Sequence, residues 1–187
     1  MSPEFDALFH ENFEFYKGTG FLISAVLVVS LQMLLPNRLA IRDLLSNWKV
    51  NVPLALINLV VLSILCGACA SAVAVSVREA RQGAFEFLGL SYYIQVVLTV
   101  FVLDLVAYLW HRANHVWSLL WRFHAVHHSD NHFDASTAVR FHLVELLISL
   151  GIRLAVVFIL GLPVLGLIVF EVIYGFFNLL VHSDLRL

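Results

Sequence analysis

The stretch LSYYIQVVLTVFVLDLVAYLWHRANH, residues 90–115, decides the fold of this chain. Residues 90–110 carry one formal charge, Asp104, and are otherwise almost entirely apolar. A bilayer core about 30 Å thick is crossed by roughly 20 helical residues. The stretch therefore predicts a transmembrane helix that leaves the membrane at Trp110 and continues directly into a pair of histidines.

Apolar runs of similar length occur on both sides of this stretch, at residues 20–35, 52–77, 143–160 and 163–181. Only Gly161 and Leu162 separate the last two runs, so these should form a tight hairpin whose two open ends face the same side. The composition agrees, because 61% of the residues are hydrophobic and 13% charged, against about 45–50% and about 25% in soluble domains. The prediction is an all-α, multi-pass transmembrane helical bundle, one membrane domain over residues 1–187.

Basic residues in the short connections predict the orientation, because Lys and Arg are retained on the cytoplasmic side. Six are counted on one side and three on the other: Arg38, Arg42, Lys49, Arg112, Arg122 and Arg140 against Lys17, Arg78 and Arg81. Segments 36–51 and 111–142 are therefore expected in the cytoplasm, where they form a histidine-rich cap.

Charge and cysteine content exclude other classes of protein. A net charge of -2 provides no basic field for nucleic acid. The acidic first residues do not fit the start of a secretory signal. Cys66 and Cys69 lie in the apolar run LCGACASA, which fits helix packing better than a redox pair or a zinc site.

Five of the nine histidines fall within 18 residues, in the boxes HRANH (111–115) and HAVHH (124–128). Residues at i, i+3 and i+4 share one face of a helix, so each box presents its imidazoles as a convergent set. The candidate ligands are His111, His115, His124, His127 and His128. Five ligands exceed the four of a tetrahedral zinc ion and favour two metals, although imidazole also suits zinc, copper and nickel.

The hairpin should bring a sixth histidine, His182, back to the boxes, with Asn178 on the same helical face as a candidate acting through water. His142 is a candidate to line the site, and His132 follows turn-forming residues that favour a loop. Asp104, two turns before His111, could accept the second N–H of a liganding imidazole or bind an arginine. Arg153, in the middle of a span, needs an acidic partner, with Asp104 and Glu171 as candidates.

The runs DLVAYLWHRANH, LWRFHAVHHSD and STAVRFHLVE resemble the fatty acid hydroxylase superfamily, which includes sterol desaturases, over roughly residues 100–187. The resemblance implies a membrane enzyme with a di-iron centre that hydroxylates or desaturates a lipid C–H with O2 and two electrons. It carries the family's iron ligands to His111, His115, His124, His127, His128 and His182. His142 and Glu145 match a recurrent R-x-H-x-x-E stretch, a candidate second layer around the metals. Without a haem or dinucleotide motif here, the electrons are expected from an external ferredoxin or cytochrome b5 type donor.

The resemblance also implies a further HxxHH box downstream, whereas this chain ends five residues after His182. The expectation is a fragment or an incomplete site, and this chain by itself is not expected to turn over a substrate. The alternatives are a non-catalytic membrane protein stabilised by a metal such as zinc, or a bis-histidine haem carrier, which would want single histidines within the bilayer. Zinc is also expected on purification of an iron protein, because it binds nitrogen-rich sites more tightly than Fe(II).

Overall fold

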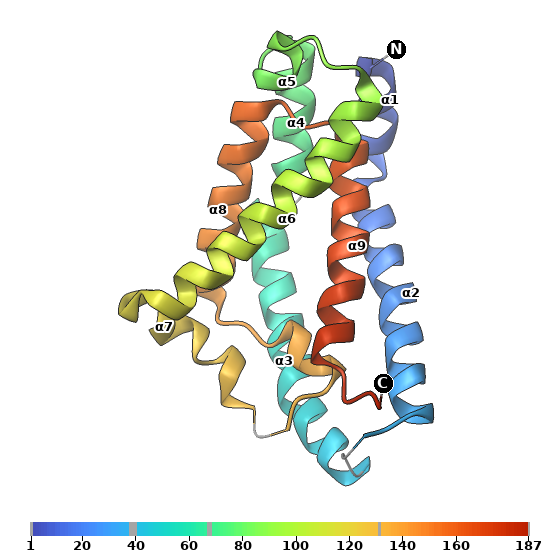
Figure 1. Ribbon diagram of the computed structural model, residues 1–187, viewed down its shortest axis with the longest axis vertical. Helices are drawn as coiled ribbons and strands as arrows, with labels where there is room; N and C mark the ends of the chain where they lie inside the picture. The colour runs from blue at the N-terminus through green and yellow to red at the C-terminus, as the bar shows by residue number, and fades with distance from the viewer. Residues whose placement is uncertain (1, 38–40, 67–68, 131, 187) are drawn as a thin grey trace.

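The computed structural model describes residues 2–37, 41–66, 69–130 and 132–186, and the regular secondary structure in these ranges is helical, apart from an isolated bridge between Pro36 and Leu185 (Figure 1). The α-helices are α1 (Ser2–Glu11), α2 (Phe13–Leu34), α3 (Ile41–Cys66), α4 (Cys69–Glu79), α5 (Ala84–Phe87), α6 (Tyr92–Val116), α7 (Ser118–His124), α8 (Leu143–Leu160) and α9 (Val164–His182). Two 3-10 helices, η1 (His127–Ser129) and η2 (Ala135–Val139), lie between α7 and α8.

Five segments of the described chain are long and apolar enough to cross a membrane. They are Phe13–Leu34, Asp43–Phe87, Tyr92–Val116, Leu143–Leu160 and Val164–His182. The predicted multi-pass helical membrane protein is confirmed. Arg38, which entered the orientation count, and Gly67 and Ala68, within the 52–77 run, lie outside the described residues.

Helix α6 extends beyond the expected end of its span and carries the first histidine box in helical geometry. It ends at Val116, and Trp117 takes an extended conformation that turns the chain into α7. The box is therefore rigidly continuous with the span, and His111 and His115 lie one turn apart on one face.

The short turn between α8 and α9 is confirmed, and it separates two helices with different neighbours. Gly161 ends α8 in the left-handed conformation, φ 69°, which glycine adopts without steric cost. From there α8 packs on α4, whereas α9 packs between α2 and α6. Gly166 makes the close approach to α6 possible, because a Cβ there would lie 2.8 Å from Cβ of Thr99. The start of α8 and the end of α9 lie toward the same end of the bundle (Figure 1).

Buried charges in the helices are paired. Near the α8–α9 turn, Arg78 pairs with Asp6, and Asp6 also accepts hydrogen bonds from the backbone N–H of Val164 and the Tyr92 hydroxyl. Within the spans, Arg153 pairs with Glu171, the second of its two expected candidates. These pairs offset the high cost of charge in hydrocarbon.

Candidate metal centre

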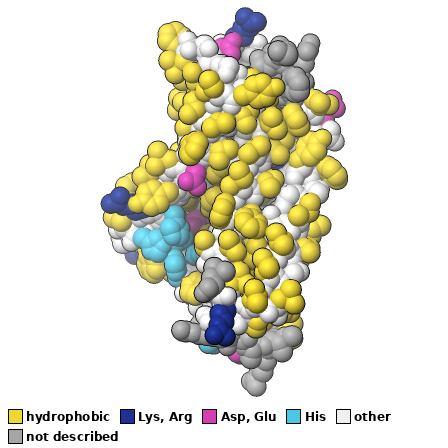
Figure 2. Space-filling view, turned by 45° about the vertical axis from the view of Figure 1, so that its right-hand side comes forward, with side chains coloured by type: hydrophobic (Ala, Val, Ile, Leu, Met, Phe, Trp, Pro, Cys, Tyr) yellow, Lys and Arg dark blue, Asp and Glu magenta, His cyan; other side chains and the backbone are white. Residues whose placement is uncertain are grey.

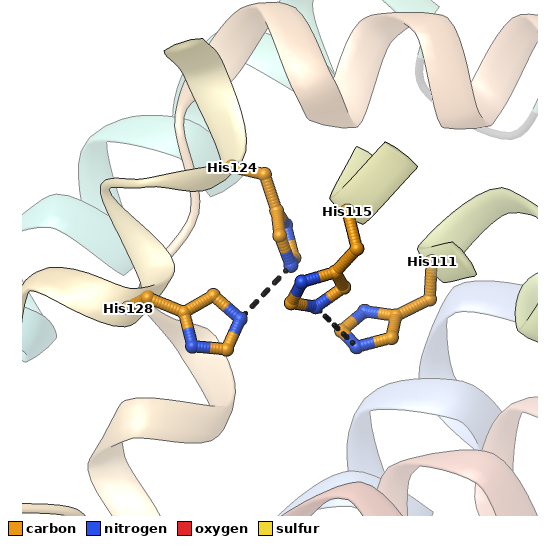
Figure 3. A group of neighbouring side chains, drawn as sticks. All are labelled: His111, His115, His124 and His128. Carbon is orange, nitrogen blue, oxygen red and sulfur yellow. Dashed lines mark hydrogen bonds between the residues drawn. The ribbon is translucent and has the colours of Figure 1, made fainter. Parts of the chain in front are cut away.

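Four imidazoles from three elements converge beside α6. His111 and His115 come from the last turns of α6, His124 ends α7, and His128 lies in η1. One ligand atom from each of the four lies within 4.8 Å of the others (Figure 3). The Nε2 atoms of His111 and His115 are 3.1 Å apart, and those of His124 and His128 are 3.2 Å apart. We call this group the histidine quartet.

The other two candidate histidines form a pair next to the quartet. Nε2 of His182 lies 2.9 Å from Nε2 of His127, as the hairpin argument predicts. The His127 ring in turn stacks on that of His124, with 5.3 Å between ring centroids. All six imidazoles thus belong to one continuous cluster at one end of the bundle.

Hydrogen bonds at the opposite ring nitrogens determine the state of the pair. Nδ1 of His127 donates to the Arg140 carbonyl (3.2 Å), and Nδ1 of His182 donates to the Asn178 carbonyl (2.7 Å). A backbone carbonyl can only accept, so both Nδ1 atoms carry a proton, and in the neutral rings both Nε2 atoms present bare lone pairs. Two lone pairs facing each other at 2.9 Å repel unless a cation lies between or beside them.

The cluster fits a metal site. Two nitrogens bound to one ion at about 2.0–2.1 Å are about 2.9 to 3.4 Å apart when the angle at the metal is about 90 to 110°. The three observed Nε2 separations, 2.9, 3.1 and 3.2 Å, fall in this range. Burial first, and then repulsion by His182, lowers the pKa of His127 to about 3, and the pKa of His128 is also lowered. Neutral imidazole, the form that binds metals, is favoured for both.

Glu145 and Asn114 form a second layer around His124. Glu145, in the first turn of α8, accepts a hydrogen bond from Nδ1 of His124 (2.8 Å), and Asn114 approaches the same carboxylate oxygen at 3.4 Å. Such a bond leaves the Nε2 lone pair of His124 free for a ligand. Sequence reasoning missed Asn114, although its place inside the HRANH box, three residues after His111 and so on the same helical face, was a usable signal.

Comparison with known proteins finds a match for the part of the chain that carries the histidine cluster. The fatty acid hydroxylase family matches from within α6 to the last residue and includes all six histidines and Glu145. Residues 96–187 belong to the fatty acid hydroxylase family. The ornithine lipid hydroxylase OlsE of Rhizobium tropici is 31% identical over 90 residues, which cover 48% of this chain and 27% of that relative. The match thus spans about a quarter of the relative's length, and no solved structure matches.

The three other candidates, His142, Asn178 and Asp104, make contacts that differ from those of the six clustered histidines. Nδ1 of His142 accepts from the N–H of Val144 and caps α8. The Asn178 amide donates to the Ala138 carbonyl, so its backbone and not its side chain meets His182. Asp104 makes no hydrogen bond or ion pair within the described ranges. The roles of His142, Asn178 and Asp104 at the centre therefore stay predictions. His132 lies in the loop before η2, as expected.

An apolar groove lies between α6 and α9 and leads toward the centre. Its volume is about 400 Å³, and its lining is Val100, Phe101, Asp104, Phe170, Ile173, Tyr174, Phe177, Asn178 and Val181. Asp104 is two helical turns from His111, and Val181 adjoins His182. In Figure 2 the histidines gather in one patch beside a broad hydrophobic face. The groove thus lies between two of the helices that are long and apolar enough to cross a membrane.

Proposed function

We propose that this protein is a di-iron, O2-dependent lipid hydroxylase or desaturase. The observation that carries the proposal is the convergence of six imidazoles, of which His127 and His182 face each other with bare Nε2 atoms 2.9 Å apart. Family membership of residues 96–187 supports the same chemistry.

The two parts of the cluster suggest a division of ligands. The quartet would hold one iron, and His127 and His182 would belong to the second. Glu145 would keep His124 in the tautomer that presents Nε2 and would supply negative charge to an otherwise neutral ligand set. Iron, when bound, supplies the activation of O2 that attack on an unactivated C–H requires.

The remaining residues would bring the lipid to the site and exclude water. The groove between α6 and α9 would face the bilayer and take an alkyl chain. Trp121 stacks on the His128 ring at 5.5 Å between ring centroids and shields one side of the quartet. In hydroxylation the C–H becomes C–OH, the second oxygen atom leaves as water, and two electrons and two protons are consumed. An external donor of the ferredoxin or cytochrome b5 type would supply these electrons on the cytoplasmic side.

The test uses the protein in lipid nanodiscs, loaded anaerobically with Fe(II) and supplied with a ferredoxin reductase system, ¹⁸O2 and membrane lipids. From protein that binds two irons, we expect a lipid product that is desaturated or carries ¹⁸O, detected by mass spectrometry. Zinc-loaded protein and a His124→Ala variant are the controls and should give none. Absence of product from protein shown to contain two irons would contradict the proposal.

The quartet by itself favours a second candidate, a metal-stabilised membrane protein without catalysis. Four imidazole nitrogens within 4.8 Å match the ligand number of one structural zinc. In that case, Zn(II) would raise the melting temperature, a single metal would bind, and iron-loaded protein would leave the lipids unchanged.

A further inference from the structure

Helix α3 carries a stripe of asparagines that the proposed chemistry does not use. Asn47, Asn51 and Asn58 are spaced by four and seven residues, so they lie on one helical face. Polar side chains within membrane helices are costly unless they are hydrogen-bonded. All three donate to the segment between the second histidine box and α8, and all three lie outside the part that matches the family.

Asn51 is the centre of this stripe and is 0% exposed. Its amide donates to the Asp130 carboxylate and to the Ser136 hydroxyl, both at 2.9 Å. Its carbonyl oxygen accepts from Nη1 of Arg140 at 2.7 Å. The buried side chain of Asn51 therefore connects Asp130, after η1, with Ser136 and Arg140, in and after η2.

Arg140 connects Asn51 to the histidines. Its Nε donates to the Val126 carbonyl (2.8 Å) and its Nη2 to the Ser129 hydroxyl (2.7 Å), one residue before and one residue after η1's two histidines. Its own carbonyl accepts the Nδ1–H of His127. The orientation of His127 thus depends on Arg140, and that of Arg140 depends on Asn51.

The partner of His127 is held from a second membrane helix. Gln32 of α2 is buried, and its Oε1 accepts from the N–H groups of Ala135 and Asp184, both at 3.0 Å. Asp184 is two residues after His182. One amide oxygen therefore fixes η2 relative to the segment that follows the His182 helix.

We propose that Asn51 is a positioning residue that holds His127 against His182, with Gln32 fixing the opposite side of the pair. The effect of Asn51 that we expect on metal binding rests on the proposed function, whereas its effect on the position of His127 does not. The half of the chain before the family match thus sets the geometry of the histidine pair.

The test exchanges the amide of Asn51 and the carboxylate of Asp130. Asn51→Asp places a second carboxylate against Asp130 and should release the loop. The double variant Asn51→Asp/Asp130→Asn restores one amide, one carboxylate and an acceptor for Arg140, so it should restore the loop. Asn51→Ala removes the contacts without adding charge. Asn12→Asp, the same chemical change at the exposed residue that immediately precedes α2, is the matched control.

The readout is modification of His127 by diethyl pyrocarbonate in metal-free protein, followed by peptide mass spectrometry. His127 is 2% exposed, so the wild type should react slowly. We expect modification about tenfold faster in Asn51→Asp and Asn51→Ala, as the loss of buried hydrogen bonds to a charged group predicts. The double variant and Asn12→Asp should react like the wild type. Protection of His127 in both single variants, or a double variant as reactive as Asn51→Asp, would overturn the proposal.

A second measurement separates this inference from the proposed function. Titration with Co(II), followed by its visible absorption, should show metal affinity about 10- to 100-fold weaker in Asn51→Asp, with recovery in the double variant. If the wild type binds no metal, the proposed function fails while the labelling still decides the role of Asn51.

Discussion

At the scale of single residues, hydrogen bonds at one ring nitrogen decide what the other can do. His127 and His182 give their Nδ1 protons to backbone carbonyls, and His124 gives its proton to Glu145. In each case the Nε2 atom points toward the cluster with a free lone pair. The protein has therefore fixed three imidazole tautomers that present Nε2, which would reduce the reorganisation that the proposed metal binding requires.

Replacement of Glu145 by Gln tests this second layer. The amide keeps the size of the side chain but removes the charge that stabilises the His124 N–H donor, so we expect metal affinity to fall about 10- to 100-fold. Competition with a chelator, read by Co(II) absorption, measures the change. Glu86→Gln, at an exposed residue of α5, is the control, and equal affinities in the two variants would remove Glu145 from the site.

Acid should destabilise the metal-free protein through His127. Its pKa is about 3 in the folded protein, against 6.5 for an unperturbed imidazole, so between these values the unfolded chain binds more protons. The free energy of unfolding therefore falls as the pH falls below 6.5, by at most about 1.4 kcal/mol per pH unit for this group. Thermal unfolding in detergent at pH 7.5 and 5.5 measures the effect, and His127→Gln should reduce it. The effect should not vanish, because the lowered pKa of His128 acts in the same direction.

At the scale of helices, α9 determines the spacing of the site because it packs between α2 and α6 and ends at His182. Small residues permit this packing. Besides Gly166 against Thr99, a Cβ at Gly20 of α2 would lie 2.4 Å from a methyl of Val172. Close approach at small residues is a general device of membrane helices, which lack a hydrophobic drive to associate in lipid.

A pair of glycine substitutions tests this packing. Gly166→Ala forces Cβ against Thr99 and should destabilise the protein by about 1–3 kcal/mol, as overpacking does. Gly151→Ala, in α8, meets no atom within 4 Å, and should be neutral or stabilising by up to about 1 kcal/mol through helix propensity. Thermal unfolding of both variants in the same detergent gives the comparison. A melting temperature unchanged in Gly166→Ala would show that α6 and α9 are not in close contact.

At the scale of the whole molecule, the histidine cluster and the buried Asp6–Arg78 pair occupy different ends of the bundle. The α8–α9 turn lies beside Arg78, whose Nη1 donates to the Gly161 carbonyl. The start of α8 and the end of α9 then reach the histidines. In a bilayer this arrangement would expose the histidine cluster on one side.

Cysteine labelling in sealed vesicles tests the sidedness. With Cys66 and Cys69 replaced by Ala, a membrane-impermeant maleimide should reach Leu119→Cys from the cytoplasmic side and Leu88→Cys from the opposite side. Both residues are exposed, 63% and 64% respectively. Labelling of both cysteines from one side would contradict the predicted topology, and labelling in the reverse sense would contradict only the orientation.

The sequence alone was sufficient for the features that depend on local pattern. The apolar run before Trp110 determines a membrane helix whatever its neighbours, because no other regular structure satisfies its backbone in lipid. The spacing of His111 and His115, and the two-residue turn at Gly161, likewise follow from helical periodicity and chain length. These features placed His182 near the boxes.

Only the tertiary structure decided which groups meet across the bundle. Sequence reasoning considered Asp104 as the acceptor for an imidazole, yet Glu145 takes that position beside His124, because the packing of α7 on α8 brings the two together. Asn51 was only the last residue of the segment 36–51 expected in the cytoplasm, and sequence reasoning gave it no role. The role of an amide in a membrane helix depends on which loop folds over it, and long-range packing settles this where local periodicity cannot.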